Sequence, residues 1–291
     1  MKIVIFGKKF DPGQAPYLQQ LFDELYVRDA RVCVYQPYFN LIKHNVQFKS
    51  KPGLFKQSKD IQNLDFLFSI GGDGTLLDAI PYVHDLGVPI LGINLGRLGF
   101  LSSVSKSEMQ KAISHIYDGS YQLEQRALLR LEQPADIFGH LNFALNDLTL
   151  YRNTNTSLIS VQVFINDVFL NTYWGDGLII ATPTGSTAYS MSVGGPILTP
   201  GSENFVIAPI ASHNLTVRPI VIQDNAEIRI KINGREDEYL LTMDSRQTLI
   251  NKTQEIKIKK CNFKINLMQM PGQNFFSTIR EKLFWGVDNR N

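Results

Sequence analysis

The sequence has few cysteines, little net charge and no long apolar run. Its 291 residues include two cysteines, Cys33 and Cys261, and neither lies in a Cys-x-x-Cys or Cys/His cluster. This pattern excludes a disulfide framework and a zinc site of the usual spacing, and it favours a reducing, cytoplasmic location. The formal net charge is only +2, which gives no electrostatic argument for nucleic acid or an anionic membrane as partner. No stretch approaches the about 18 apolar residues of a membrane span, and the apolar run at residues 2–6 is too short for a signal peptide.

The chain does have enough apolar material for more than one core. Hydrophobic residues make up 44% of it and charged residues 19%, which excludes wholesale disorder and a low-complexity chain. At roughly 150 residues per domain, the length predicts about two domains.

The first third of the sequence alternates between strand-like and helix-like segments. The predicted strands are residues 2–6, 31–35, 65–70 and 88–93, and the predicted helices are residues 17–27 and 76–84. Strands that alternate with helices indicate a doubly wound parallel sheet. We therefore expect an α/β domain over residues 1–118, with the basic stretch 43–59 as a loop.

After about residue 120 the pattern changes to short β-rich runs. The expected strands are residues 128–131, 142–151, 158–165, 168–174, 177–181, 205–208, 220–222, 227–232, 239–243, 255–258 and 263–268. Turns such as Asn166-Asp167 separate them, so the pattern predicts a mostly antiparallel all-β domain over residues 119–273. A C-terminal helix at about 274–291 is expected to pack back on the first domain.

Residues 71–75 read Gly-Gly-Asp-Gly-Thr and directly follow an apolar strand. A strand, a glycine loop and a helix place backbone amides at a helix N-terminus, where phosphate binds. No Gly-Lys-Ser/Thr follows, so this is not a Walker A loop. A carboxylate beside phosphates is repelled unless it faces a hydroxyl that it deprotonates or a bound cation. Asp73 in this position therefore indicates phosphoryl transfer to an alcohol. The alternative is a turn aspartate. Thr75 with Asp78 predicts a capping box for the helix.

Two further segments offer groups that recognise a nucleotide. Asn146-Asp147 ends an apolar run, and an amide beside a carboxylate can bind an adenine edge and a ribose hydroxyl pair, although most such pairs are turns. Gly175-Asp176-Gly177 leads into a strand and then into residues 182–190, which carry hydroxyls, small residues and one aromatic ring. That loop suits a base, a sugar and phosphates, and an ordinary capped Ser/Thr loop is the alternative.

Four segments occur in the order in which they occur in NAD kinases. These are residues 71–75, 92–101, 146–147 and 175–192. The sequence therefore resembles a bacterial NAD kinase over essentially its whole length. The first segment alone is shared with phosphofructokinases and with diacylglycerol and sphingosine kinases, whereas the ordered set is far more specific.

The resemblance implies roles for individual residues. Asp73 matches the proton acceptor for the adenosine 2′-hydroxyl of NAD. Asn146 and Asp147 match an Asn-Glu pair that holds the adenosine part, with Asp147 one methylene shorter than the usual Glu. Asp176 matches an aspartate on the nicotinamide side, and Tyr189 matches a stacking ring.

Further residues are implied as substrate-binding. They are Gly74, Phe100, Trp174, Thr184, Thr187, Ala188, Ser190, Met191, Ser192 and Arg246. Arg246 stands where the family has Gln, which either removes one contact or adds a cation near phosphate. His213 and Arg218 lie in a segment that resembles a site-lining segment of the family, and a surface loop is the equal alternative.

The implied reaction transfers the γ-phosphoryl group of ATP to NAD and yields NADP. We find no all-protein metal cage, so the expected cofactor is Mg²⁺, or another divalent cation, delivered with ATP. The resemblance implies NAD and ATP as partners, no nucleic acid and no membrane. It also implies a homodimer or homotetramer whose neighbouring subunits contribute to one nicotinamide pocket.

Two other functions stay open at this point. One is a lipid or sugar kinase of the wider Gly-Gly-Asp-Gly group. Against a lipid kinase, the chain has no membrane-binding segment and its 184–192 loop follows the NAD kinase pattern. The other is a dinucleotide-binding sensor without transfer activity. The sequence does not decide the use of NADH, the choice of phosphate donor, or regulation by NADPH.

Overall fold

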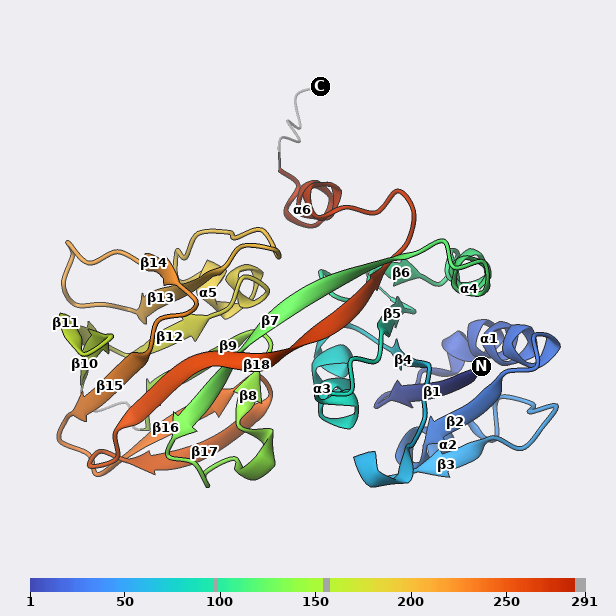
Figure 1. The fold of residues 1–291 in the computed structure, drawn as a ribbon, viewed down its shortest axis with the longest axis horizontal. Helices are drawn as coiled ribbons and strands as arrows, with labels where there is room; N and C mark the ends of the chain where they lie inside the picture. Colours follow the sequence, from blue (N-terminus) through green and yellow to red (C-terminus); the bar gives the residue numbers. More distant parts are fainter. Residues whose placement is uncertain (97–98, 154–157, 286–291) are drawn as a thin grey trace. The chain divides into compact units, whose positions relative to one another are not determined.

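The computed structural model describes residues 1–96, 99–153 and 158–285. The chain, traced in Figure 1, divides into two compact units. Unit 1 comprises Met1–Gln125 and Ile265–Asn291, and unit 2 comprises Arg126–Lys264. Among the described residues, no helix has both the length and the apolar character needed to cross a membrane.

Unit 1 is built on a parallel sheet. Its strands, in spatial order, are β3 (Gly53–Phe55), β2 (Arg31–Tyr35), β1 (Lys2–Gly7), β4 (Phe66–Ile70) and β5 (Ile90–Asn94), and every pairing among them is parallel. The other edge of β5 pairs with β6 (Val104–Ser105) and, through Leu267 opposite Ile90, with β18 (Ile256–Gln269). The prediction of a parallel α/β fold is confirmed.

Each helix of unit 1 buries at least one apolar side chain. They are α1 (Ala15–Val27), α2 (Gln36–Ile42), α3 (Asp73–Val83), α4 (Met109–Tyr117) and α6 (Phe275–Leu283), with short 3-10 turns η1 (Pro12–Gln14) and η2 (Ser58–Asp60). Helix α1 buries Leu18, Leu21 and Leu25, which are the helically spaced residues of the predicted segment. Helices α2 and α4 were not predicted, and the expected 43–59 loop contains β3.

Unit 2 consists of antiparallel strands, as predicted. One sheet has the order β14 (Ile220–Gln223), β13 (Asn204–Ile210), β12 (Gly177–Ala181), β9 (Asp147–Arg152), β16 (Glu238–Met243) and β17 (Arg246–Asn251). The other strands are β11 (Val168–Gly175), β10 (Ile159–Ile165), β15 (Ile228–Asn233), β18, β7 (Gln122–Gln133) and β8 (Phe143–Ala144). The remaining short elements are η3 (Gly139–Leu141), η4 (Gly185–Thr187) and α5 (Tyr189–Ser192).

The core of unit 2 lies between its two groups of strands. Leu178 and Ile180 of β12 pack in one cluster with Val161 of β10 and Ile230 of β15. The opposite face of β12 is also buried, because Ile179 packs with residues of β13 and of the segment after α5. The strand that precedes the hydroxyl-rich loop is therefore fixed on both faces.

Several details differ from the predicted strands. Residues 256–258 and 263–268 belong to one continuous strand, β18, and the predicted strand 142–151 is interrupted between β8 and β9. Strands β6 and β17 were not predicted. The expected domain ends, residues 118 and 273, fall in turns, whereas the units exchange within the long strands β7 and β18. The predicted Asn166-Asp167 turn is confirmed, since both residues have positive φ, 48° and 65°, as a tight hairpin requires.

Candidate active site

The glycine loop of unit 1 joins β4 to α3. Gly71 has a φ of 146°, and a Cβ at this position would overlap the Thr75 side chain, so only glycine fits. Helix α3 begins at Asp73, with Gly72 as its N-cap and no side-chain cap. The predicted capping box is therefore wrong. The carboxylate of Asp78 forms an ion pair with Lys8, at 2.6 Å.

The Asp73 carboxylate accepts hydrogen bonds from three successive backbone amides. The N–H of Phe100 donates to Oδ2 at 2.8 Å, and those of Leu101 and Ser102 donate to Oδ1 at 3.0 and 2.9 Å. A carboxylate has about four lone-pair positions, so the described residues leave one on Oδ2. Gly99 makes this approach possible, because a Cβ there would overlap the carboxylate. The structure thus brings Asp73 and Phe100 together, as predicted residues of one site.

A cavity of about 400 Å³ adjoins this loop within unit 1. Its lining includes Gly71, Gly72 and Thr75 of the loop, Lys9 after β1, and Asn94 at the end of β5. These positions follow the carboxyl ends of parallel strands, where α/β sheets bind ligands. Gly74 is exposed, and a Cβ there would meet no atom within 4 Å. The middle of the predicted segment 92–101, Arg97 and Leu98, lies outside the described residues.

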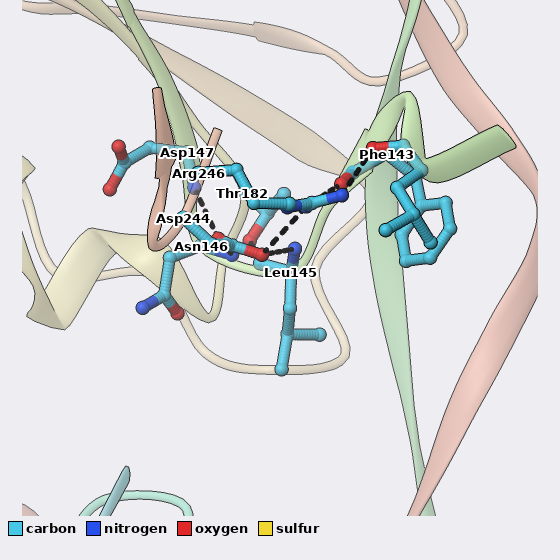
Figure 2. Close-up of polar contacts among 8 residues, drawn as sticks. Phe143, Leu145, Asn146, Asp147, Thr182, Asp244 and Arg246 are labelled. Atoms are coloured by element: carbon cyan, nitrogen blue, oxygen red, sulfur yellow. Dashed lines mark hydrogen bonds and ion pairs between the residues drawn. The ribbon is translucent and has the colours of Figure 1, made fainter. Parts of the chain in front are cut away.

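In unit 2, Asp244 holds the turn that carries the predicted Asn146-Asp147 pair. Its carboxylate accepts the N–H groups of Leu145 and Asn146, both at 2.8 Å, and that of Asp147 at 3.4 Å (Figure 2). The Asp244 side chain is only 6% exposed. Burial raises the pKa of this carboxyl, while the backbone amides and the positive charge of Arg246 oppose the rise.

Asp147 is buried and bonded to a hydroxyl of its own strand. Thr149 donates its Oγ1 hydrogen to Oδ1 at 3.0 Å. Burial, with a further contribution from the negative charge of Asp244, raises the pKa of Asp147 to about 6. The carboxylate that the sequence suggested for a ribose therefore changes charge near neutral pH. Thr149 was missed because a threonine in a strand carries no functional signal.

The hydroxyl-rich loop packs against the Asn146 turn. Thr182 donates its hydroxyl to the Leu145 carbonyl at 2.5 Å and its N–H to the Asn146 carbonyl at 2.9 Å. A Cβ on Gly185 would overlap that same Asn146 carbonyl. The predicted residues Asn146 and Thr184 thus belong to segments that pack against each other.

Arg126 is a buried neighbour of this loop that sequence reasoning missed. Its guanidinium Nη1 donates to the hydroxyl of Thr184 at 3.3 Å, and both residues are at most 5% exposed. No motif surrounds Arg126, so the sequence offered no signal for it. Thr184 therefore carries a positively charged partner that holds its side chain in place.

Tyr189 lies at the start of α5 with its side chain accessible. It is 43% exposed, unlike a ring that serves as a core anchor. Partial burial, and then the neighbouring Tyr151, Asp176 and Asp147, raise the pKa of its hydroxyl. Around it, Thr187 and Ala188 are half-buried, Ser190 is buried, Met191 is half-buried and Ser192 is exposed.

Asp176 and Trp174 stand at the end of β11. Asp176 forms an ion pair with Arg152, which the sequence did not indicate, at 3.0 Å with both side chains 20% exposed. Trp174 is 57% exposed and lines a separate cavity of about 490 Å³ with Arg235 and neighbours. None of the other predicted site residues lines that cavity. The backbone carbonyl of Trp174 accepts the N–H of His213 at 2.8 Å.

Two further predicted cations are engaged with the main chain. The guanidinium of Arg218 donates to the carbonyls of Leu215 and Val217, at 2.6 and 2.8 Å, and closes its own loop. The guanidinium of Arg246 faces the carbonyls of Leu141 and Phe143. Among the described residues, no group of three His, Cys, Asp or Glu side chains is placed to hold a metal ion.

Two family descriptions match this chain. Residues 3–121 match the ATP-NAD kinase N-terminal domain and residues 145–270 match the ATP-NAD kinase C-terminal domain. The chain belongs to the ATP-NAD kinase family. Together the two matches include the glycine loop of unit 1 and the Asn146 turn of unit 2.

Curated relatives and solved structures agree with this assignment. An NAD kinase of Flavobacterium johnsoniae is 42% identical over 294 residues and one of Cytophaga hutchinsonii is 38% identical over 292, each covering 100% of both chains. A yeast NADH kinase complexed with NADH superposes with a TM-score of 0.87 at 24% identity, covering 99% of this chain and 88% of that one. An NAD kinase from Archaeoglobus fulgidus in complex with ATP gives 0.76 at 23% identity, covering 98% and 99%. These two structures share the fold of this chain.

Proposed function

We propose that this protein is an NAD kinase that transfers the γ-phosphoryl group of ATP to the adenosine 2′-hydroxyl of NAD. The observation that carries the proposal is the environment of Asp73. Its carboxylate is fixed by three amides, the described residues leave one lone pair of Oδ2 available, and the preceding Gly71 and Gly72 line a cavity. A fixed acceptor of this kind can orient a hydroxyl and take its proton as the phosphoryl group transfers.

Asp73 acts late in the proposed reaction. A ribose hydroxyl is a far weaker acid than a carboxylic acid, so Asp73 does not ionise it beforehand. Phosphoryl transfer passes through a loose transition state in which positioning and charge stabilisation dominate. Asp73 therefore aligns the hydroxyl and receives the proton as the oxygen–phosphorus bond forms and the bond to ADP breaks.

The acceptor dinucleotide is assigned to unit 2. Asn146 offers both a donor and an acceptor to the adenosine part, and Asp147 offers a carboxylate oxygen to a ribose hydroxyl. Tyr189 presents an exposed ring for stacking on a base, and Asp176 is assigned to the nicotinamide side. The small and hydroxylated residues around Tyr189 allow the backbone to approach the ligand.

Mg²⁺ is proposed to arrive bound to ATP, and another divalent cation can take its place. The described residues include no three-carboxylate cage, which fits a metal held chiefly by phosphate oxygens. When bound, the ion supplies charge neutralisation on the transferring phosphates. The two free cysteines fit a cytoplasmic enzyme.

A homodimer or homotetramer is also proposed. Strand β11 is at the edge of its sheet and exposes Val168, Phe169 and Trp174 by 70%, 54% and 57%. An edge strand with exposed apolar side chains is a surface that pairs with another chain. Sedimentation at several protein concentrations tests this, and a monomer at every concentration contradicts it.

The deciding experiment is NADP⁺ formation from NAD⁺ and Mg-ATP with the purified chain. Turnover supports the kinase. Thermal stabilisation by NAD⁺ without turnover instead identifies a dinucleotide sensor, and phosphorylation of a sugar or lipid without NADP⁺ formation identifies another kinase of the Gly-Gly-Asp-Gly group. The same assay with NADH as acceptor, and with other triphosphates or polyphosphate as donor, defines the substrate range.

A further inference from the structure

Arg246 is the first residue of β17 and lies two positions after Asp244. Its Nη1 donates to the carbonyl of Leu141 and its Nη2 donates to the carbonyl of Phe143. The same Nη2 lies 3.8 Å from Oδ2 of Asp244, and the guanidinium stands 5.3 Å from the centre of the Phe143 ring. Figure 2 shows the side chain extended toward Phe143, away from the side chains of Asn146 and Asp147.

Arg246 and Asp244 together fix one backbone segment, one through its carbonyl groups and the other through its N–H groups. The arginine binds carbonyls at positions 141 and 143, and the aspartate binds amides at positions 145, 146 and 147. Both side chains come from the β16–β17 hairpin. The segment 141–147 is therefore attached to that hairpin along its whole length, and the side chains of Asn146 and Asp147 are left pointing outward from it.

The chemistry of the pair explains why an arginine suits this position. A carboxylate as buried as that of Asp244 is costly unless a cation and hydrogen bonds compensate it. A guanidinium carries its charge on a planar fork of donors, so it can reach two carbonyls and the carboxylate at once. The ammonium of a lysine would supply the charge without that fork. Two of the five N–H groups of Arg246 donate to these carbonyls, and the side chain extends away from Asn146 and Asp147, so the guanidinium is directed at the segment that it holds and not at the assigned substrate position.

We propose that Arg246 is a positioning residue of the acceptor site, which holds segment 141–147 so that Asn146 and Asp147 meet the adenosine part of the substrate, and that it contacts no phosphate. This inference rests on the proposed function, because that function assigns the adenosine part to Asn146 and Asp147. From the sequence, Arg246 in place of the family's Gln could mean either the loss of one contact or an added cation near phosphate. The proposal gives Arg246 a different role.

The test compares two ligands that differ in phosphate. We would measure the affinity of wild type, Arg246→Met and Arg246→Lys for NAD⁺ and for adenosine, which has no phosphate. Arg229→Met serves as control, since Arg229 is an arginine of the same unit that pairs with Asp167 and Glu255 and stands over the ring of Phe164. A positioning role predicts that Arg246→Met weakens both ligands by the same factor, about 10- to 100-fold, with Arg246→Lys in between. A loss confined to NAD⁺ identifies a phosphate contact and overturns the proposal.

A pH series separates positioning from simple stabilisation of the fold. The charged groups that face Asp244 are Arg246 and Asp147. An acid limb from Asp147, whose pKa is raised to about 6, is expected in every variant. Removal of the guanidinium makes Asp244 easier to protonate, so a further loss of NAD⁺ affinity on the acid side should begin at higher pH in Arg246→Met than in wild type and Arg246→Lys. This readout also decides the question if adenosine binds too weakly to measure.

Two outcomes contradict different conclusions. A lower melting temperature with unchanged affinity and an unmoved pH limb in the folded variants would show that Arg246 only stabilises unit 2, and would overturn the positioning role. Failure of wild type itself to bind NAD⁺ would contradict the proposed function instead.

Discussion

Asp73 in unit 1 and Asp244 in unit 2 make the same interaction in different surroundings. Each carboxylate accepts the N–H groups of three successive residues, 100–102 in one case and 145–147 in the other. Asp73 is half-buried, and the residues just before it, Gly71 and Gly72, line a cavity. The Asp244 side chain is 6% exposed and has Arg246 against it.

The difference separates a reacting group from a supporting one. Three amides fix a carboxylate in either place, but the oxygens of Asp244 are fully engaged by those amides and by Arg246, whereas Oδ2 of Asp73 accepts one amide among the described residues. The buried one needs a cation, and in return it orders the neighbouring residues. Fixing a loop by a carboxylate is therefore not in itself a sign of catalysis, and access to the remaining lone pair is what matters.

Asp73→Asn should have the largest effect on turnover. The amide cannot accept the proton of the hydroxyl, so kcat should fall by about 10²–10⁴ while NAD⁺ still binds. The control is Asp78→Asn, the same replacement on the same helix at an ion pair with Lys8. A mutant with more than about half of the wild-type turnover would show that Asp73 is not the base.

Gly99→Ala should break the Asp73 arrangement without touching the carboxylate. The added methyl overlaps the carboxylate, so either the 100–102 amides or Asp73 must move. A displacement of about 1 Å can cost on the order of 10²-fold in kcat. Gly53→Ala is the control, because its Cβ meets its nearest atom, Cys33 Sγ, at 3.4 Å. Wild-type kcat in the Gly99 variant would mean that the three amides do not position Asp73.

Asp147→Ala should raise the KM for NAD⁺ much more than the KM for ATP. The loss of a charged hydrogen bond costs about 1.5–3 kcal/mol. Steady-state kinetics with each substrate varied in turn measures both constants, with Asp237→Ala as control at an exposed ion pair of unit 2. Equal increases in the two constants would place Asp147 outside the acceptor site.

The stability of the protein should depend on the charge of Asp147. Its pKa is raised to about 6, above the ordinary value of about 3.9, so it stabilises the fold below about pH 4 and loses that contribution as the pH rises through 6. Asp147→Asn removes this titration. As the pH rises from about 4 to about 7.5, the free energy of unfolding of the variant should increase by up to about 3 kcal/mol relative to that of wild type. Urea unfolding at both pH values measures the gain, and parallel curves would contradict it.

Tyr189→Ala should weaken NAD⁺ binding by roughly 5- to 150-fold, because base stacking is worth about 1–3 kcal/mol. Tyr189→Phe should retain most of the affinity, since the ring face makes the contact. Calorimetry and melting temperatures on both variants separate this role from packing. Unchanged affinity in a folded alanine variant would exclude stacking.

The fold was predictable where side chains repeat with a clear period. Strand β15 alternates buried and less buried residues, and unit 2 was recognised from runs of this kind. Helix α4 was missed although it buries Met109, Ala112, Ile113 and Ile116 at helical spacing. The helical spacing of these apolar residues is therefore visible in the sequence itself.

The site was predictable only where function resides in the motif itself. Asp73 and its glycines were found, because a strand followed by a glycine loop has one characteristic pattern. The amides that fix Asp73 come from residues 27 to 29 positions away, and a backbone N–H is the same in every sequence. Arg126 and Arg152 have no motif around them, and only the folded chain places them against Thr184 and Asp176.

Strand β18 determines the order in which the units can be completed during synthesis. Unit 2 is one continuous segment, but the core of unit 1 includes Met268 and Met270, which are made after all of unit 2. On a ribosome that adds about 5–20 residues per second, the first segment waits on the order of ten seconds for its last strand. During that time the far edge of β5 lacks the Leu267 pairing. Unit 2 can fold while unit 1 is still incomplete, so we expect the inserted unit to be the first to become protease-resistant on the nascent chain.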